Sequence, residues 1–188
     1  MKLGVLCSGN GTNFENILRT CTKHEVVLMI SNKKDCGARL VAQKFGIPCA
    51  YSINEEWIIN ELKWSGIDLV VLAGYMKIVS KKFVNSFNHI INIHPSLLPK
   101  YKGLHAVEQA LKSGDKVTGC TVHHVNEELD GGAIIDQAEV PILPDDTVES
   151  LTKRIQRSEY ALLPYVIDNY DFKFPYSRKL SITTTNVE

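Results

Sequence analysis

The fold of this chain is best read outward from one stretch, Ile90-Ile91-Asn92-Ile93-His94-Pro95-Ser96-Leu97-Leu98-Pro99. The apolar, β-branched residues at its start predict a strand, and the two prolines prevent either a strand or a helix from continuing. Residues two apart in a strand point to the same face, so Asn92 and His94 would meet at one spot. The alternative is purely structural: His94 caps the strand and Asn92 satisfies loop backbone.

Before this stretch, strands and helices alternate. Alternation of this kind implies right-handed crossovers and a doubly wound, Rossmann-like α/β fold with a mainly parallel sheet. Ligands bind such sheets at the carboxyl ends of the strands. We expect strands at Leu3–Leu6, Val26–Ile30, Ile47–Ser52 and Asp68–Leu72, and helices from Phe14 to Cys21, through Leu40 and Phe45 to Gly46, and from Glu55 to Lys63.

After the stretch the pattern changes. Two segments rich in β-branched residues, Thr118–Val125 and Ala133–Val140, predict an antiparallel hairpin. A short helix is expected before them, at about 106–112, and a long helix after them, which Asp146-Thr147 would cap and which would run to about Asp168 with a kink at Pro164. The sequence therefore predicts an antiparallel C-terminal extension of the sheet and a long C-terminal helix, followed by a tail at 171–188 of unassigned order.

Composition narrows the classes of function. The 188 residues suit one domain, and 21 basic against 21 acidic residues indicate neither a nucleic-acid-binding nor a membrane-binding surface. A small polar ligand is therefore expected. The longest apolar stretch, 69–79, is too short to span a bilayer. Five cysteines without metal-finger spacing predict reduced thiols that act as apolar fillers in a cytoplasmic protein without a metal site: Cys7, Cys21, Cys36, Cys49 and Cys120.

Two further loops are expected at the edge of the sheet where Asn92 lies. Ser8 to Asn13 joins a strand to a helix, where free backbone N–H groups and the helix dipole can hold a phosphate, and Thr12 and Asn13 can cap the helix or donate to a ligand. The apolar loop at 73–79 suits a flat organic ring. The structural alternatives are an ordinary turn for the first loop and core packing for the second.

The hairpin loop adds carboxylates to this edge. Asp130 precedes two glycines and can be held in a tight turn that faces the same edge, whereas Glu127 and Glu128 are expected to be solvated. His123 and His124 should face opposite sides of their strand, and either can be a satisfied core histidine. Together these residues offer no convincing set of metal ligands.

Taken in order, six motifs resemble the folate-dependent formyltransferases that act on glycinamide ribonucleotide (GAR). The motifs are Ser-Gly-Asn-Gly-Thr-Asn (8–13), Leu-Ala-Gly-Tyr-Met-Lys-Ile-Val (72–79), Asn-Ile-His-Pro-Ser-Leu-Leu-Pro (92–99), Gly-Leu-His (103–105), Thr-Gly-Cys-Thr-Val-His (118–123) and Glu-Leu-Asp-Gly-Gly (128–132). The resemblance implies a single formyltransferase domain over 1–188, with a nucleotide-binding-like half at 1–104, a folate and catalytic-loop half at 105–170, and a tail. It also implies a monomer or homodimer that transfers a formyl group from 10-formyltetrahydrofolate to the GAR amine.

The resemblance also implies roles for individual residues. The catalytic group would be Asn92, His94 and Asp130, with the aspartate supporting the imidazole. The phosphoribosyl part of GAR would be held by Gly11, Thr12, Asn13, Gln156 and Glu159. Folate would contact Met76, Lys77, Ile78, Val79, Asn92, Asn126, Glu127, Glu128, Leu129 and Asp130. Lys77 replaces an arginine common in the family, Lys102 replaces a proline, and Asn54-Glu55-Glu56 lacks the family's basic folate contact.

The chemistry of formyl transfer suits these residue types. Attack of an amine on the formyl carbon builds negative charge on oxygen, which an amide N–H from Asn92 and an imidazolium can stabilise. His94 can donate or relay the proton that moves from the amine to the folate nitrogen, and Asp130 would favour its charged form. Two related enzymes, formyltetrahydrofolate deformylase and methionyl-tRNA formyltransferase, resemble the chain around Asn92, but they generally carry a further regulatory or RNA-binding domain. A non-catalytic folate or nucleotide sensor is the alternative from another class.

Overall fold

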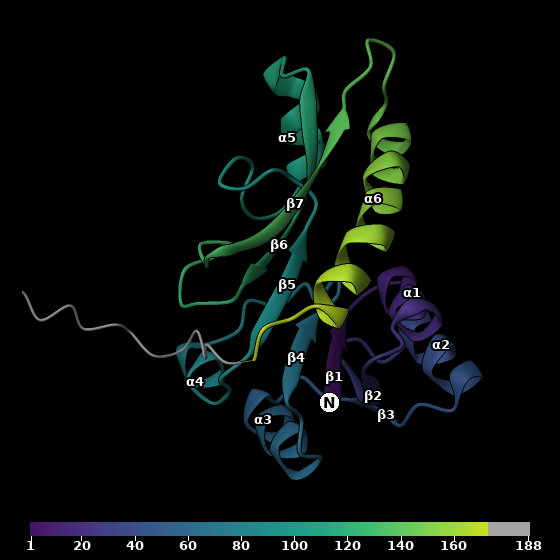
Figure 1. Cartoon of the computed structure of the whole chain (residues 1–188), viewed down its shortest axis with the longest axis vertical. Coiled ribbons are helices and arrows are strands. Elements are labelled where there is room, and N and C mark those ends of the chain that lie inside the picture. Colours follow the sequence, from purple (N-terminus) through teal and green to yellow (C-terminus); the bar gives the residue numbers. More distant parts are fainter. Residues whose placement is uncertain (173–188) are drawn as a thin grey trace, which may run out of the picture.

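The computed structural model describes residues 1–172, which form a seven-stranded sheet with helices on both faces (Figure 1). The order of the strands is β3-β2-β1-β4-β5-β6-β7. Their bounds are β1 Lys2–Cys7, β2 Glu25–Ser31, β3 Cys49–Tyr51, β4 Leu69–Leu72, β5 Ile90–His94, β6 Val117–His124 and β7 Ile134–Pro141. The first five pair in parallel, whereas β5 with β6 and β6 with β7 pair antiparallel. The predicted doubly wound fold with an antiparallel extension is confirmed.

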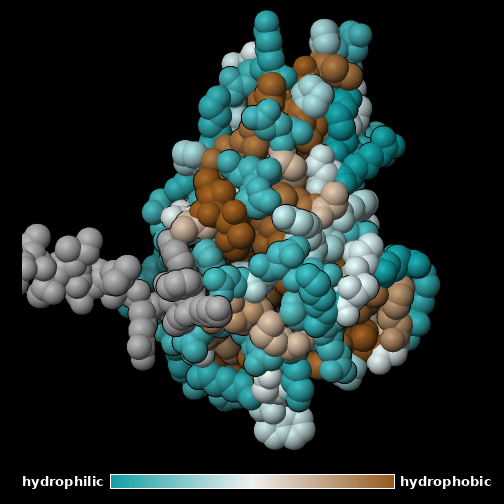
Figure 2. All heavy atoms as spheres, viewed as in Figure 1, coloured by the Kyte–Doolittle hydropathy of each residue, from teal (hydrophilic) through white to brown (hydrophobic). Residues whose placement is uncertain are grey.

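The helices divide between the two faces of the sheet, as Figure 1 shows. They are α1 Thr12–Thr20, α2 Gly37–Phe45, α3 Glu55–Trp64, α4 Lys81–Val84, α5 Ala106–Ser113 and α6 Val148–Asp168. Apolar residues of α1, α2, α5 and α6 pack in one core cluster, and those of α3 and α4 pack in another. Neighbouring residues of one strand pack in different clusters, because side chains alternate between the two faces of a strand. Val71 packs in the first cluster and Val70 in the second. In Figure 2, polar side chains cover most of the visible surface and apolar ones gather beside α6.

Two elements differ from the sequence-based expectation. The third strand was expected over 47–52 but spans Cys49–Tyr51 alone. Helix α4 was not predicted, because one turn is too short to show a helical period. Its sequence signal is the cap, since the Ser80 hydroxyl accepts a hydrogen bond from the Phe83 amide at 3.2 Å.

Helix α6 begins where its cap was predicted. The Thr147 hydroxyl accepts from the Ser150 amide, and the Ser150 hydroxyl accepts from the Thr147 amide, which completes a capping box. Asp146 adds a paired hydrogen bond with Arg154 at 2.7 and 2.9 Å. The helix continues through Pro164 to Asp168, so the kink at this proline stays a prediction.

Residues 1–172 contain no helix that combines the length and the apolar character needed to cross a bilayer. All five cysteines are free thiols, and Cys7 and Cys120 are buried. Burial is the main reason why the pKa of Cys120 is raised to about 12. The tail predicted from residue 171 lies, from residue 173 onward, outside the described residues.

Candidate active site

Strand β5 delivers Asn92 and His94 to the same side of the sheet, where both meet Asp130 from the β6–β7 loop. The distance from His94 Nδ1 to Asp130 Oδ2 is 3.4 Å, and the distance from Asn92 Nδ2 to Asp130 Oδ1 is also 3.4 Å. The side chains of His94 and Asp130 are 7% and 8% exposed. The structure therefore brings together, in a largely buried cluster, the amide, the imidazole and the carboxylate that the sequence singled out.

Asp130 is held by an unusual backbone turn. Its φ is +47°, in the left-handed region that a short polar residue tolerates better than most. The Gly103 amide donates to Asp130 Oδ2 at 2.8 Å. Burial alone would raise the pKa of the Asp130 carboxyl, but the neighbouring imidazoles of His123 and His94 and the hydrogen bond from the Gly103 amide hold this pKa below its ordinary value. The carboxylate is therefore ionised at neutral pH.

Both ring nitrogens of His94 face hydrogen-bond acceptors. Nε2 donates to the carbonyl oxygen of Tyr101 at 2.8 Å, and Nδ1 faces Asp130. A neutral imidazole has one N–H, so only the doubly protonated ring can donate on both sides. The site therefore offers an acceptor to each ring nitrogen of His94 when the ring is protonated.

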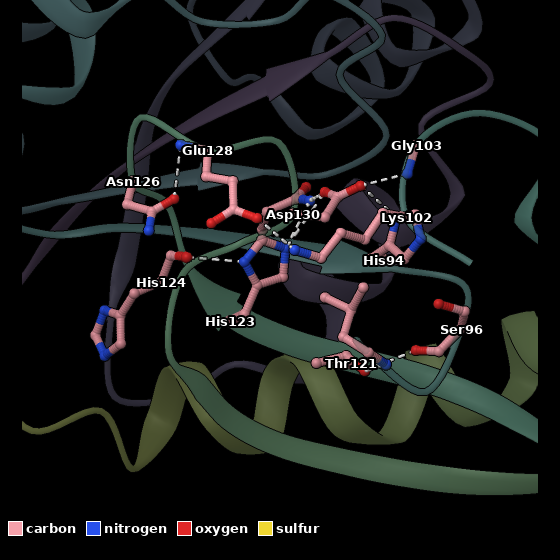
Figure 3. Close-up of polar contacts among 12 residues, drawn as sticks. His94, Ser96, Lys102, Gly103, Thr121, His123, His124, Asn126, Glu128 and Asp130 are labelled. Carbon is pink, nitrogen blue, oxygen red and sulfur yellow. Dashed lines mark hydrogen bonds and ion pairs between the residues drawn. The ribbon is translucent and has the colours of Figure 1, made fainter. Parts of the chain in front are cut away.

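The turn after His94 is held by a chain of buried hydrogen bonds, part of which is drawn in Figure 3. Thr121 Oγ1 donates to the Ser96 carbonyl at 2.6 Å and accepts from the Leu98 amide at 3.1 Å. The Ser96 hydroxyl donates to the Lys100 carbonyl at 2.6 Å. This network places the Tyr101 carbonyl, which in turn orients the imidazole of His94.

His123 is a fourth member of the cluster that sequence reasoning did not assign to it. Its side chain is 2% exposed, Nε2 lies 3.1 Å from Asn92 Nδ2 and 3.6 Å from Asp130 Oδ1, and Nδ1 lies 2.7 Å from the His124 carbonyl oxygen. As expected, His124 faces elsewhere: its Nδ1 lies 3.3 Å from the hydroxyl of Tyr170. The signal that was missed is strand register, since His123 pairs with Asn92 across β5 and β6.

The loop between β1 and α1 lies at the start of α1, as expected. Gly11 is the N-cap residue with φ +76°, and a Cβ there would lie 2.6 Å from the Ala38 Cα, so its close approach is to α2. Neither Thr12 nor Asn13 caps the helix. Instead, Asn13 Nδ2 donates to Glu159 Oε2 at 2.8 Å.

Of the pair of Asn13 and Glu159, Glu159 is buried and Asn13 is partly buried. Burial raises the pKa of the Glu159 carboxyl, and the hydrogen bond from Asn13 opposes that shift. The Oδ1 atom of Asn13 is also buried and has no hydrogen-bond partner among residues 1–172. Gln156 lies one helical turn before Glu159 on α6. The structure thus joins Asn13 to Glu159, although 146 residues separate them.

Ser8 links this loop to the apolar loop at 73–79. Its buried hydroxyl donates to Asn32 Oδ1 at 2.6 Å and accepts from the Met76 amide at 2.7 Å. Met76 and Ile78 are 63% and 71% exposed, whereas Val79 packs against the core. Lys77 Nζ donates to the Ile53 carbonyl at 2.8 Å. The loop therefore presents apolar side chains to solvent and is fixed at its base.

In the hairpin loop, Glu127 and Glu128 are exposed, as expected. Each also forms a surface ion pair, with Lys81 at 3.0 Å and Lys102 at 2.7 Å. Such exposed pairs contribute little stability. Asn126 Oδ1 accepts from the Glu128 amide at 3.0 Å, and Leu129 is 48% exposed. Among residues 1–172, no group of three or more His, Cys, Asp or Glu side chains is arranged to hold a metal ion.

An amide, a carboxylate and two imidazoles at the ends of the strands of an α/β sheet are suited to acyl transfer. The chain belongs to the formyl transferase family, whose model matches residues 1–167. It is 43% identical to the phosphoribosylglycinamide formyltransferase of Haemophilus influenzae (88% of this chain, 85% of the relative) and 41% identical to that of Escherichia coli (89% and 85%). A solved structure of phosphoribosylglycinamide formyltransferase from Anaplasma phagocytophilum superposes with a TM-score of 0.87, at 44% identity, over 89% of this chain and 85% of that one.

Proposed function

We propose that this protein transfers the formyl group of 10-formyltetrahydrofolate to the amine of GAR, giving formyl-GAR and tetrahydrofolate in de novo purine (IMP) biosynthesis. The observation that carries the proposal is the cluster of Asn92, His94 and Asp130, in a chain whose relatives are phosphoribosylglycinamide formyltransferases. We place the protein in the cytoplasm, because thiols stay reduced there and its five cysteines are free.

The two substrates would approach the cluster from different loops. The phosphoribosyl group of GAR would lie on Gly11, Thr12 and Asn13, with Gln156 and Glu159 below it, because the N-terminus of α1 offers free N–H groups to a phosphate. The folate would lie along Met76 to Val79 and along Asn126 to Asp130. The exposed apolar side chains of Met76, Ile78 and Leu129 support this placement, since a flat ring gains by covering them.

The charges of the cluster suit the proposed reaction. When the amine attacks, the formyl oxygen becomes negative, and an imidazolium at His94 stabilises that charge in a largely buried site. Asp130 holds His94 in this form and remains ionised itself, because its pKa is lowered. The amine then loses a proton and the folate nitrogen gains one, and His94 is the group suited to relay it.

The test is an assay of the full chain with both substrates, in which the product folate is followed. We expect His94→Ala and Asp130→Asn to lower kcat by about 100-fold or more. Glu149→Gln is the control, because this residue pairs with Lys153 on the exposed side of α6. Undiminished turnover in His94→Ala would contradict the assigned role, and folate consumption that does not need GAR would indicate a deformylase.

A further inference from the structure

The orientation of the Asn92 amide is fixed by the neighbour that sequence reasoning missed. The Nδ1 atom of His123 lies 2.7 Å from the His124 carbonyl oxygen, which can only accept, so Nδ1 carries a proton (Figure 3). In a neutral ring, Nε2 is then an acceptor and needs a donor opposite it. The atom opposite, at 3.1 Å, is Asn92 Nδ2.

The second hydrogen of Asn92 Nδ2 is also engaged. It points to Asp130 Oδ1 at 3.4 Å, and Asp130 is itself fixed through the Gly103 amide. Both amide hydrogens of Asn92 are therefore directed into the cluster. Its Oδ1 atom takes part in no hydrogen bond within residues 1–172 and is not among the buried unpaired atoms there, so it is accessible to a substrate.

We propose that His123 is a positioning residue that holds the Asn92 amide with Oδ1 toward the substrates, where it accepts a hydrogen bond from the attacking amine. This reverses the role expected from the sequence, in which Asn92 donates to the formyl oxygen. The inference rests on the proposed function. An acceptor suits the chemistry, because the nitrogen of the amine becomes positive as it attacks and the hydrogen bond to Oδ1 then strengthens.

The first test does not depend on activity. In protein labelled with ¹⁵N-histidine, two-bond ¹H–¹⁵N spectra at neutral pH report which ring nitrogen of each histidine carries the proton, and the spectrum of His123→Phe identifies the signals of His123. We expect a neutral His123 ring with its proton on Nδ1. A proton on Nε2, alone or together with Nδ1, would overturn the proposal, because Asn92 would then have to turn its oxygen toward the ring.

The second test ranks variants of Asn92. Asp keeps an acceptor oxygen but loses the N–H donor, whereas Ala loses both. If Asn92 accepts from the amine, kcat of Asn92→Asp should exceed that of Asn92→Ala by about tenfold. If Asn92 donates to the formyl oxygen, a carboxylate repels the developing negative charge and Asn92→Asp will be no better than Asn92→Ala, which would overturn the proposal.

The third test asks whether His123 acts through Asn92. We expect His123→Phe to lower kcat by about tenfold or more in the native background, with KM values changed less than about threefold, and to cost less than about threefold in the Asn92→Ala background. An equal fold decrease in kcat in the two backgrounds would mean that His123 does not act through Asn92, which would overturn the proposal. His24→Phe, at the opposite end of the sheet and in edge contact with Phe172, is the matched control. Absence of GAR-dependent transfer in the native protein would instead refute the proposed function. The spectra would still test the orientation of the Asn92 amide.

Discussion

At the scale of single residues, the site is organised around one carboxylate. One oxygen of Asp130 faces His94 and the Gly103 amide, and the other faces Asn92 and His123. The Gly103 and Asn92 amides direct N–H groups at this carboxylate, and the imidazoles of His94 and His123 lie beside it, which explains how a largely buried carboxylate keeps a lowered pKa. Asp130 is therefore the one group that all the other polar groups of the cluster contact.

The turn that holds Asp130 leads to a prediction for Gly132. A Cβ at this position would lie 1.8 Å from the His124 carbonyl oxygen, which is backbone and cannot move aside cheaply. We expect Gly132→Ala to lower the free energy of unfolding by about 2 kcal/mol or more and to reduce kcat, because His124 O also orients His123. The control is Gly114→Ala, where φ is +79° but the space is open, so that about 1 kcal/mol of backbone strain is expected. Urea unfolding that shows equal losses for the two variants would contradict this account.

The sequence could predict those residues of the site whose positions depend on the pattern of their immediate neighbours in the chain. Asn92 and His94 follow from the two-residue period of a strand, and Asp130 from the two glycines after it. His123 could not be assigned, because its contact with Asn92 depends on the register of β5 with β6, which strand patterns do not fix. The contact between the Tyr101 carbonyl and His94 could not be predicted either, since it depends on how the chain turns between these two residues, which are 7 positions apart.

At the scale of elements, the proline in α6 explains a contact between helices. Pro164 has no N–H, so the carbonyl of Tyr160 lacks its usual intrahelical donor. Asn16 of α1 supplies the donor instead, with its Nδ2 at 2.5 Å from that oxygen. The helix can therefore carry an interior proline without leaving a carbonyl unpaired.

A double-mutant cycle tests this explanation. Asn16→Ala should lower the free energy of unfolding by about 1–2 kcal/mol, because the Tyr160 carbonyl loses its partner. In the Pro164→Ala background the new N–H can bond that carbonyl, so Asn16→Ala should cost less than about 0.5 kcal/mol there. Urea unfolding of the four proteins measures both costs, and equal costs would refute the explanation.

His124, the last residue of β6, should make the free energy of unfolding depend on pH. Burial, followed by the neighbouring imidazoles of His89 and His123, lowers the pKa of His124 to about 4. Its pKa in the unfolded chain is higher, at about 6.5, so the unfolded state binds the proton first and stability is lost as pH falls from about 6.5 to 4. Because the ring is only partly buried, we expect a loss of about 1–2 kcal/mol, below the full linkage value.

The contribution of His124 is measured as a difference between proteins, because other groups also titrate in this range. His124→Asn should lose less stability than the native protein between pH 7 and pH 4.5, as measured by urea unfolding. His105→Asn, with its side chain 70% exposed, should keep the native slope. A slope in His124→Asn equal to that of the native protein would show that the buried ring does not couple to folding.

At the scale of the whole molecule, the architecture was predictable because long periodic segments dominate it. The sheet was recognised from apolar runs separated by amphipathic helices, and the hairpin from β-branched segments. The elements that were shortened or missed, β3 and α4, span 3 and 4 residues. In such short segments tertiary contacts decide the structure, and sequence period carries little information.

The proposed division of one domain into halves at 1–104 and 105–170 has a consequence for folding. Strand β5 of the first half pairs with β6 of the second, and α6 packs against α1 and β1 in one core cluster. Removing the second half would expose that cluster and leave β5 as an unpaired edge, so neither half should fold alone.

Fragments of the chain test this expectation. Thermal unfolding of residues 1–104 and of residues 105–188, each followed by circular dichroism, should show no cooperative transition, and each fragment should bind a dye that reports exposed apolar surface. An equimolar mixture should regain a cooperative transition if the fragments associate through β5 with β6 and through α1 with α6. A cooperative transition of residues 1–104 alone would mean that the parallel half is a domain in its own right, and that the contacts of Asn13 with Glu159 and of His94 with Asp130 join two domains.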